Sequence, residues 1–473
     1  MTAAALAQTA AERLVAAQAG LDTPLSARLV GLVGIATMIG LAVLLSYDRK
    51  KIDWRLVGSG LVLQAVFGIL VLKTGPGRAI FNAAGRAITG LLGFQEQGAR
   101  FVFGNLVQST VPVGVPGPNG ALDTTAGFVA STGSYFAFNV LPTIIFFSAL
   151  MSVLYYLGIM QLVVKGIAWV MQKTLRTSGA ETLSAAGNIF LGQTEAPLLI
   201  KPFVKTFTSS ELNTVMVGGF ATVAGGVLAA FVGMLQGSFP NIAAHLLAAS
   251  VMNAPAGLIL SKIIRPETGV PLTRGSLSME VGEPVTKRSL KVEVERTESN
   301  VIDAAASGAA QGVQLAINVA AMLMAFVALV ALLNFGLGWV GSSVLHLPGE
   351  RLSLQYLLGQ LLRPLTWVMG VPWEDSTYVG GLIGVKASLN EFVAYAQFSS
   401  DLGNGIVLAP RSAVIATYAL LGFANFSSIA IQIGGIGGLA PERRGEIAKL
   451  GLRAMIAGNL AAFMSASLAG MLV

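Results

Sequence analysis

Two glutamates stand out in this sequence because each lies in a short polar motif within long apolar surroundings. Glu195 belongs to the stretch Gly187-Asn-Ile-Phe-Leu-Gly-Gln-Thr-Glu-Ala-Pro197, and Glu391 to Ala387-Ser-Leu-Asn-Glu-Phe-Val-Ala-Tyr395. An ionised carboxylate accepts hydrogen bonds, whereas a neighbouring amide both donates and accepts them. This combination suits a solute that carries hydroxyl groups and ring nitrogens. No lysine or arginine lies within either stretch, so an anionic solute would be repelled.

The composition places these acids in a membrane protein. Of the 473 residues, 54% are hydrophobic and 11% are charged, whereas soluble domains carry about 25% charged residues. Acids at membrane depth are rare and usually functional. The net charge of +7 does not indicate nucleic-acid binding, because the basic residues cluster in short loops, as the positive-inside rule describes. With no cysteine, and His245 and His346 as the only histidines, thiol chemistry and a histidine-rich metal site are disfavoured.

The apolar pattern predicts an all-α polytopic membrane protein with about eight transmembrane helices. A run of about 20 apolar residues is needed to span the bilayer. The expected spans are residues 29–45, 56–72, 136–160, 212–235, 243–264, 309–333, 414–435 and 450–473. Residues 76–94, interrupted by Arg78 and Arg86, predict an amphipathic helix at the interface. The stretch 111–134, rich in Pro, Gly, Ser and Thr, predicts a loop.

Two regions are too broken to span and predict re-entrant hairpins. In residues 174–207 and 352–398, glycines and prolines interrupt short apolar runs around Glu195 and Glu391. Each region is followed by a span that contains Gly-Phe-Ala. The first hairpin starts from the inside and the second from the outside, so the repeats are inverted. Paired, interrupted segments of this kind indicate the binding site of a transporter, where a cavity or neighbouring protein satisfies the unwound backbone.

The basic loops give one orientation, with both termini outside the cytoplasm. We expect six parts: residues 1–173 as N-terminal helices, interfacial helix and part of a scaffold; 174–264 as the first transport repeat; 265–300 as a cytoplasmic linker; 301–350 as a scaffold helix; 351–440 as the second transport repeat; and 441–473 as the C-terminal span. No cleavable signal peptide is expected. Residues 3–19 are compatible with a short surface helix.

Simpler interpretations exist for most of these polar residues. Glu195 and Glu391 could be structural hydrogen-bond partners of neighbouring segments. Asn188 could cap a broken half-helix, and Ser427 could bond back to its own helix backbone. Phe423 could be a packing residue. An intramembrane enzyme is disfavoured, because the two acids lie in separate repeats with no metal-ligand cluster or nucleophile–base pair nearby.

Four motifs in their order along the chain resemble concentrative nucleoside transporters. They are Gly192-Gln-Thr-Glu-Ala-Pro197, Glu298-Ser-Asn-Val-Ile-Asp303, Asn390-Glu-Phe392 and Gly422-Phe-Ala-Asn-Phe-Ser-Ser428. The resemblance runs from about residue 29 to the C-terminus. It implies an inner-membrane homotrimer with one substrate site near mid-membrane in each protomer, working by alternating access. The implied partners are a nucleoside and the lipid bilayer, not nucleic acid.

The resemblance also implies roles for individual residues. Those facing the nucleobase or ribose would be Gln193, Thr194, Glu195, Glu391, Phe423, Asn425 and Ser428. A sodium ion would lie at Asn188, Leu191, Thr222 and Val223. A shell of oxygens without a carboxylate suits a monovalent ion better than magnesium or calcium. The family also has proton-coupled members, so a proton is the alternative coupling ion. The other alternative is a transporter of the same fold for another small polar solute.

Overall fold

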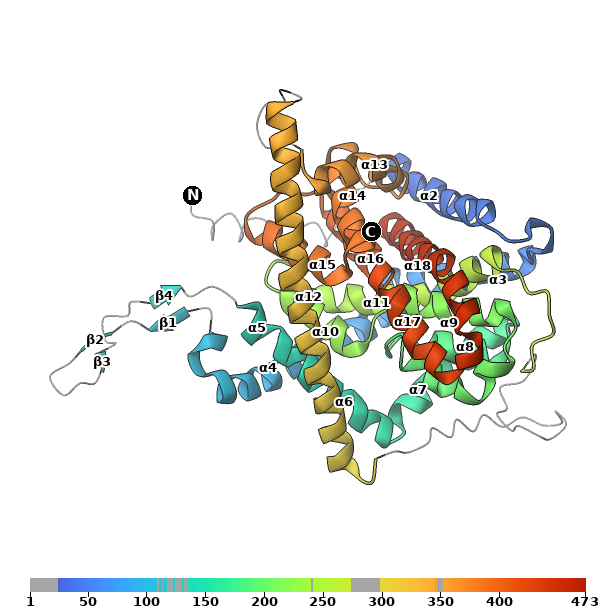
Figure 1. Ribbon diagram of the computed structural model, residues 1–473, viewed down its shortest axis with the longest axis horizontal. Coiled ribbons are helices and arrows are strands. Elements are labelled where there is room, and N and C mark those ends of the chain that lie inside the picture. The colour runs from blue at the N-terminus through green and yellow to red at the C-terminus, as the bar shows by residue number, and fades with distance from the viewer. Residues whose placement is uncertain are drawn as a thin grey trace.

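A computed structural model describes most of the chain. The described residues are 24–108, 110–112, 114–116, 122–123, 129–131, 135–239, 241–273, 298–344, 346 and 352–473. The surface helix expected at residues 3–19 and most of the linker expected at 265–300 lie outside them. Within the described residues the protein is a bundle of helices with two small strand pairs at one side (Figure 1).

The helices follow the broken pattern that the sequence predicts. In chain order they are α2 (Leu25–Leu44), η1 (Arg49–Lys51), α3 (Trp54–Lys73), α4 (Gly75–Phe103), η2 (Gly104–Val107), α5 (Phe136–Asn139), α6 (Leu141–Tyr156), α7 (Ile159–Leu175), α8 (Gly179–Gly187), η3 (Ala196–Thr206), α9 (Ser209–Ala221), α10 (Gly225–Leu235), α11 (Ile242–Ile264), α12 (Val301–Ser343), α13 (Leu354–Val368), α14 (Trp373–Ser388), α15 (Glu391–Gly403), α16 (Pro410–Leu420), α17 (Phe426–Leu439), η4 (Pro441–Arg443) and α18 (Arg444–Leu472).

Six helical segments in the described part of the chain are long and apolar enough to cross a membrane. They are Trp54–Lys73, Phe136–Tyr156, Ser209–Leu235, Ile242–Ile264, Val301–Ser343 and Pro441–Leu472. The first expected span is covered by α2, which has 20 residues, whereas the seventh contains the shorter apolar helix Phe426–Leu439. The seventh is short because the chain unwinds between α16 and α17, which leaves two half-helices where the sequence predicted one span.

The structure corrects the expected loop at residues 111–134. Strand β1 (Thr110–Pro112) pairs with β4 (Val129–Ser131), and β2 (Val115–Pro116) pairs with β3 (Leu122–Asp123), both antiparallel. Valine occurs in three of these four strands, and its branched side chain favours extended backbone. The prediction of an all-α protein therefore holds for the bundle but not for this projecting segment, at the far left of Figure 1.

A second correction concerns the third expected span, at residues 136–160. The helix ends at Tyr156, and Gly158 adopts a left-handed conformation with φ of +80° before α7 begins. Glycine reaches this conformation without steric penalty. Helix α7 is therefore a separate element, with a buried side formed by Met160, Val164, Ala168, Met171 and Leu175. Its other side carries Lys165 and Lys173.

The two halves of the bundle repeat one order of elements. In the first half, a long helix (α6) leads to α7, the hairpin α8–η3, the interrupted pair α9–α10 and then α11. In the second half, α12 leads to α13, the hairpin α14–α15, the interrupted pair α16–α17 and then α18. Contacts between the halves are reciprocal, because α6 packs on α12, α9 on α18 and α11 on α16.

Several basic segments meet at one end of the bundle. The backbone amide of Tyr47 donates to the carbonyl of Ile264 at 2.9 Å. The guanidinium groups of Arg265 and Arg453 lie 4.3 and 4.0 Å from the centre of the Tyr47 ring. At the same end, the Ser209 hydroxyl donates to the Glu446 carboxylate. The loop after α2, the end of α11 and the start of α18 therefore share one side of the protein.

The α12 helix crosses the bundle as its longest element (Figure 1) and packs closely on α6. A Cβ atom added at Gly308 would lie 2.6 Å from the Ser152 Cβ and 2.7 Å from the Ser148 carbonyl oxygen. One added at Gly312 would lie 2.7 Å from the Ile145 Cα. These two glycines, four residues apart on one helix face, let the α6 and α12 backbones approach each other.

We expect Gly308→Ala to lower the thermal midpoint of the purified protein in detergent. The added methyl overfills the α6–α12 crossing, which destabilises a packed interface by about 1–3 kcal/mol. Gly336→Ala is the matched control on the same helix, because a Cβ there meets nothing within 4 Å and alanine favours the helix by about 0.5–1 kcal/mol. Equal midpoints for the two variants would contradict the proposed close crossing.

Candidate functional site

A chain of hydrogen bonds connects the first hairpin to Glu391 in the second. The Gln193 side-chain amide donates to the Ser428 hydroxyl at 3.1 Å, and the Ser428 backbone amide donates to the Asn425 side-chain oxygen at 2.9 Å. The Asn425 amide in turn donates to Glu391 Oε2 at 2.7 Å. All four side chains are buried. The structure thus brings together four of the residues that the sequence singled out, from three separate motifs.

Glu391 begins helix α15 and is only 3% exposed. Its neighbour Asn390 caps the helix, since the Asn390 side-chain oxygen accepts a hydrogen bond from the Val393 backbone amide at 2.9 Å. A carboxylate in the first turn is stabilised by the positive end of the helix dipole. The second carboxylate oxygen of Glu391 can accept hydrogen bonds from a bound solute.

Helix α17 presents its polar N-terminal turn to this cluster. Ser427 donates to the Asn425 side-chain oxygen at 2.7 Å, and Ser428 accepts from Gln193. The alternative that Ser427 bonds back to its own helix backbone is not what the structure shows. Phe423 is half-buried, and its backbone amide donates to the Thr222 carbonyl at 3.3 Å. The unwound segment of the second repeat therefore touches that of the first.

Glu195 differs from Glu391 in its surroundings. It lies at the tip of the first hairpin, where its Oε2 accepts a hydrogen bond from the Gly192 backbone amide at 2.7 Å. Its side chain and that of Thr194 are exposed in the protomer. The Thr194 methyl lies 2.9 Å from where a Cβ of Gly435 would be, so the tip rests against α17. Both residues are free to meet a solute.

Gln432 belongs to this cluster, and the sequence interpretation missed it. Its side-chain amide donates to the Gln193 side-chain oxygen and to the Met216 carbonyl, both at 3.1 Å. Its own side-chain oxygen is buried without a hydrogen-bond partner. The available signal was its spacing, because Gln432 follows Ser428 by four residues on an otherwise apolar helix and so lies on the same face.

Asn188 forms a second, separate feature at the end of α8. It is 0% exposed, and neither polar atom of its side chain has a hydrogen-bond partner. A Cβ added at Gly218, in the last turn of α9, would lie 3.0 Å from Asn188 Nδ2. Asn188 occupies the capping position after α8, where its backbone amide donates to the Ser184 carbonyl at 2.9 Å, but its side chain makes no capping hydrogen bond. A buried polar group without a partner costs about 1–3 kcal/mol, which makes this side chain a candidate for binding a ligand.

The surroundings of Asn188 are rich in oxygen and contain an interrupted helix end. Thr222 follows the last residue of α9, and its hydroxyl donates to the Gly218 carbonyl at 2.9 Å. Leu191 and Val223 lie in non-helical segments beside Asn188 and Thr222. The last carbonyls of a helix lack intrahelical partners and carry partial negative charge. Neutral oxygens at such an end fit a monovalent cation.

An asparagine from a neighbouring helix holds each helix break. The Asn253 amide on α11 donates to the Ala221 carbonyl at 2.7 Å, and the Asn459 amide on α18 donates to the Ala424 carbonyl at 2.9 Å. Gly422 has a φ of +117°, and a Cβ there would lie 2.6 Å from the Phe220 carbonyl oxygen. Only glycine fits this approach.

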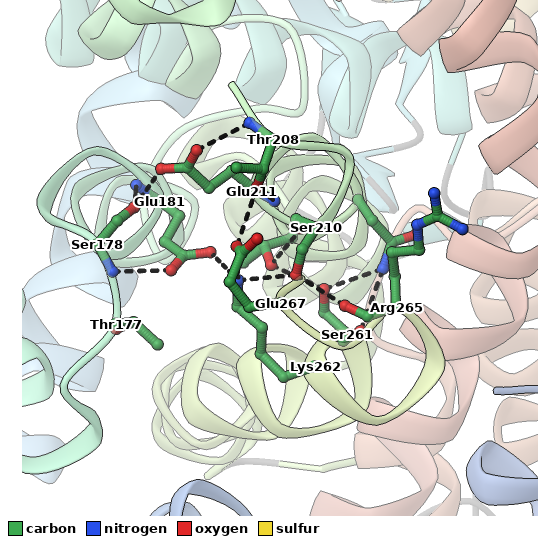
Figure 2. Close-up of polar contacts among 12 residues, drawn as sticks. Thr177, Ser178, Glu181, Thr208, Ser210, Glu211, Ser261, Lys262, Arg265 and Glu267 are labelled. Carbon is green, nitrogen blue, oxygen red and sulfur yellow. Dashed lines mark hydrogen bonds and ion pairs between the residues drawn. The ribbon is translucent and has the colours of Figure 1, made fainter. Parts of the chain in front are cut away.

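A buried ionic cluster fixes the base of the first hairpin. Lys262, near the end of α11, places its ammonium 2.7 Å from Glu181 Oε2 and 3.3 Å from Glu267 Oε2 (Figure 2). The ammonium also donates to the Ser210 hydroxyl at 2.9 Å. Lysine 262 and Glu181 have side chains only 6% and 2% exposed. Removing one partner of such a buried pair leaves an uncompensated charge.

The same cluster joins two helix starts. Ser178 caps α8 and Thr208 caps α9, each in a capping box with the glutamate three residues later. The Ser178 hydroxyl donates to Glu211 Oε1 at 2.6 Å, so one capping box is bonded to the other (Figure 2). Helices α8, α9 and α11 are therefore bound together at this end.

A different arrangement fixes the base of the second hairpin. Asp375, in the first turn of α14, accepts hydrogen bonds at its Oδ2 from the Ala409 backbone amide at 3.0 Å and the Ser412 hydroxyl at 2.5 Å. These bonds join the start of α14 to the start of α16. Tyr378 donates to Asp401 at 2.8 Å and joins α14 to α15. The donors here are neutral groups.

Two interrupted hairpins, two broken helices and polar clusters at the breaks define a class of protein, the secondary transporter built from inverted repeats. Three family sequence models match the chain: "Na+ dependent nucleoside transporter N-terminus" at residues 33–106, "Nucleoside recognition" at 137–238, and "Na+ dependent nucleoside transporter C-terminus" at 245–470.

Similar proteins agree with these matches. An uncharacterized transporter of Haemophilus influenzae is 42% identical over 448 residues, covering 94% of this chain and 98% of that protein. Sodium/nucleoside cotransporter 1 of Rattus norvegicus is 41% identical over 466 residues, covering 94% of this chain and 64% of the rat protein. The chain thus spans less than two thirds of that longer relative. It belongs to the concentrative nucleoside transporter family, is a multi-pass membrane protein and is not an enzyme.

Solved structures of CNTnw share the fold. The inward-facing substrate-bound state is 43% identical and superposes with a TM-score of 0.79, covering 94% of this chain and 98% of CNTnw. A doubly substituted CNTnw in an outward-facing state is 42% identical with a TM-score of 0.80, covering 94% and 97%.

We expect Lys262→Met to destabilise the protein by about 3 kcal/mol, because it leaves Glu181 buried without its cation. The measurement is the thermal midpoint in detergent. Lys51→Met is the matched control, since the Lys51–Asp48 pair spans 3.9 Å between side chains that are 58% and 41% exposed, and an exposed pair contributes about 0–1 kcal/mol. If both variants melt like the parent protein, the cluster does not stabilise the hairpin base.

Proposed function

We propose that this chain is a sodium-coupled nucleoside symporter that works by alternating access. The observation that carries the proposal is the hydrogen-bonded chain from Gln193 through Asn425 to Glu391, with the unpaired Asn188 amide beside it. It connects both hairpins to a broken helix. A solute bound there would therefore contact the two hairpins and the broken helix, which must move together during transport.

The polar groups match the two halves of a nucleoside. A ribose offers neighbouring hydroxyl donors, and Glu391 offers a buried carboxylate acceptor, with Asn425 and Ser428 next to it. A nucleobase offers donors and acceptors in one plane, which suits Gln193, Thr194 and Glu195 on the first hairpin. The half-buried Phe423 would line the base pocket. The lack of a cation on the first hairpin's tip argues against a phosphorylated substrate.

The groups around Asn188 support sodium rather than a proton as the coupling ion. The Asn188 side chain, the Thr222 hydroxyl and the carbonyls of Leu191 and Val223 would hold it, and none of these groups titrates near neutral pH. Sodium supplies a positive charge at the C-terminal end of α9, where helix carbonyls favour it. The unpaired Asn188 side-chain oxygen gains a partner in this way, and the first hairpin is held against α9.

The exposed surface of α12 supports a homotrimeric scaffold in the inner membrane. The helix has 43 residues, which makes it about 65 Å long at 1.5 Å per residue. Only 17% of its most apolar 18-residue stretch is buried within the protomer. Its large exposed apolar side chains include Ile302, Ile317, Met324, Leu329, Leu332, Phe335 and Trp339. Subunit contacts and lipid would share this surface. Both chain termini would lie on the periplasmic side of the membrane.

We expect the parent protein in proteoliposomes to accumulate uridine when a sodium gradient is directed inward at fixed pH, and Glu391→Ala to abolish this uptake. Losing the ribose acceptor removes hydrogen bonds to a charged group, which together weaken binding by about 3 kcal/mol, roughly 100-fold. Glu374→Ala is the matched control, because Glu374 is an exposed acid on the same hairpin.

Two results would contradict the substrate assignment. One is normal uridine uptake by Glu391→Ala. The other is loss of folded protein in Glu391→Ala but not in Glu374→Ala, which would make Glu391 a structural residue. Uptake of a different polar solute in a competition panel, with no competition from any nucleoside, would support the alternative substrate class.

We expect Asn188→Ala to raise the sodium concentration that half-saturates uridine binding by about tenfold, the equivalent of about 1.4 kcal/mol. The measurement is equilibrium binding of radiolabelled uridine in detergent across a sodium series. Asn404→Ala is the control, because Asn404 is exposed on the second hairpin. Uridine uptake that follows a proton gradient and ignores sodium would retain the substrate assignment and refute this ion site.

A further inference from the structure

Lys386 is a buried lysine that the substrate and ion sites leave without a role. It lies in the last turn of α14 and is 0% exposed. Its ammonium donates to the Ala419 carbonyl at 2.9 Å and to the Leu421 carbonyl at 3.3 Å. It also lies 5.8 Å from the centre of the Phe463 ring. Lys386 directly precedes the motif around Glu391, where the sequence interpretation found no cation.

These partners form a cation site at a helix end. Ala419 and Leu421 flank the last residue of α16, where the chain unwinds before α17. Carbonyls at a helix C-terminus carry partial negative charge, and the face of an aromatic ring also attracts a cation. A buried ammonium is costly unless hydrogen bonds and opposite charge compensate it. Glu391, five residues later on the same hairpin, is a buried acid that can carry the opposite charge.

The first repeat has a corresponding place without a lysine. Helix α8 packs on α9 as α14 packs on α16. Asn188 follows the end of α8 and lies against the last turn of α9 with both polar atoms unpaired. Asn188 is the residue directly after α8. Lys386 lies three residues, or about one turn, before the corresponding position after α14. Its side chain is long enough to bring the ammonium to the end of α16.

We propose that the Lys386 ammonium is a tethered monovalent cation, which in the second repeat takes the place that a free sodium ion takes at Asn188 in the first. This inference rests on the proposed function insofar as it compares the two sites. The second hairpin is then held on its broken helix by a cation that cannot dissociate. Of the two hairpins, only the first depends on an ion from solution, and one free ion per protomer meets that need.

Hydrogen–deuterium exchange of the purified protein in detergent tests this directly, at the backbone amides of residues 421–426. In Lys386→Ala we expect exchange at these amides to rise by about tenfold, because the helix end loses its cation and opens locally more often. Propylammonium matches the removed part of the side chain and should restore slow exchange at millimolar concentration. Lys386→Met fills the space without charge, so it should exchange fast with or without propylammonium.

Three results would overturn the proposal. They are slow exchange in Lys386→Met, restoration of Lys386→Ala by neutral propanol as effectively as by propylammonium, and fast exchange in Lys386→Ala that propylammonium leaves unchanged. If Lys386→Ala does not fold, Lys386→Arg replaces it. Slow exchange in Lys386→Arg beside fast exchange in Lys386→Met supports a cation, and equal exchange in the two overturns it.

This experiment uses neither uridine nor sodium. A protein that fails to transport any nucleoside would refute the proposed function and leave the exchange result standing. Conversely, sodium-driven uridine uptake combined with slow exchange in Lys386→Met would retain the function and refute the tethered cation.

Discussion

The fold depends on satisfying backbone groups where two helices unwind inside the bundle. An unsatisfied carbonyl or amide at membrane depth costs several kcal/mol. The Ala221 and Ala424 carbonyls are therefore bonded by Asn253 and Asn459, and the Phe423 amide reaches across to the Thr222 carbonyl. Each break is held by a helix of its own repeat, and the two breaks are held by each other. The polar residues proposed to bind solute lie around this same junction.

The use of charge separates the two repeats although their elements correspond. At the first break, the buried Asn188 side chain has no hydrogen-bond partner, and we propose that a free cation binds there. At the second, the Lys386 ammonium donates to the Ala419 and Leu421 carbonyls at the end of α16. Both breaks leave helix-end carbonyls with partial negative charge, which favour a nearby cation. In our proposal, a free ion meets this need in the first repeat and a lysine side chain meets it in the second. In the proposed mechanism, this difference lets the first hairpin respond to ions in solution while the second does not.

Much of the architecture could be predicted from the sequence, because lipid imposes a simple length rule and glycines and prolines interrupt it visibly. The family resemblance placed Glu391 and Asn425 at one site, and the structure joins them by a hydrogen bond. Gln432 and Lys386 were missed because each is a lone polar residue in an apolar stretch of its helix, and only the tertiary contacts reveal its partners. Helix α7 was missed because its sequence continues the hydrophobicity of α6 and only Gly158 marks the boundary.

The bases of the two hairpins also differ, since the first has the Lys262–Glu181 ion pair and the second has neutral donors on Asp375. The desolvation penalty of a buried charge falls as temperature rises. The first base holds an ammonium and a carboxylate, whereas the second holds a carboxylate with neutral donors, so warming lowers this penalty more at the first base. The first hairpin base is therefore expected to lose less of its stability on heating than the second.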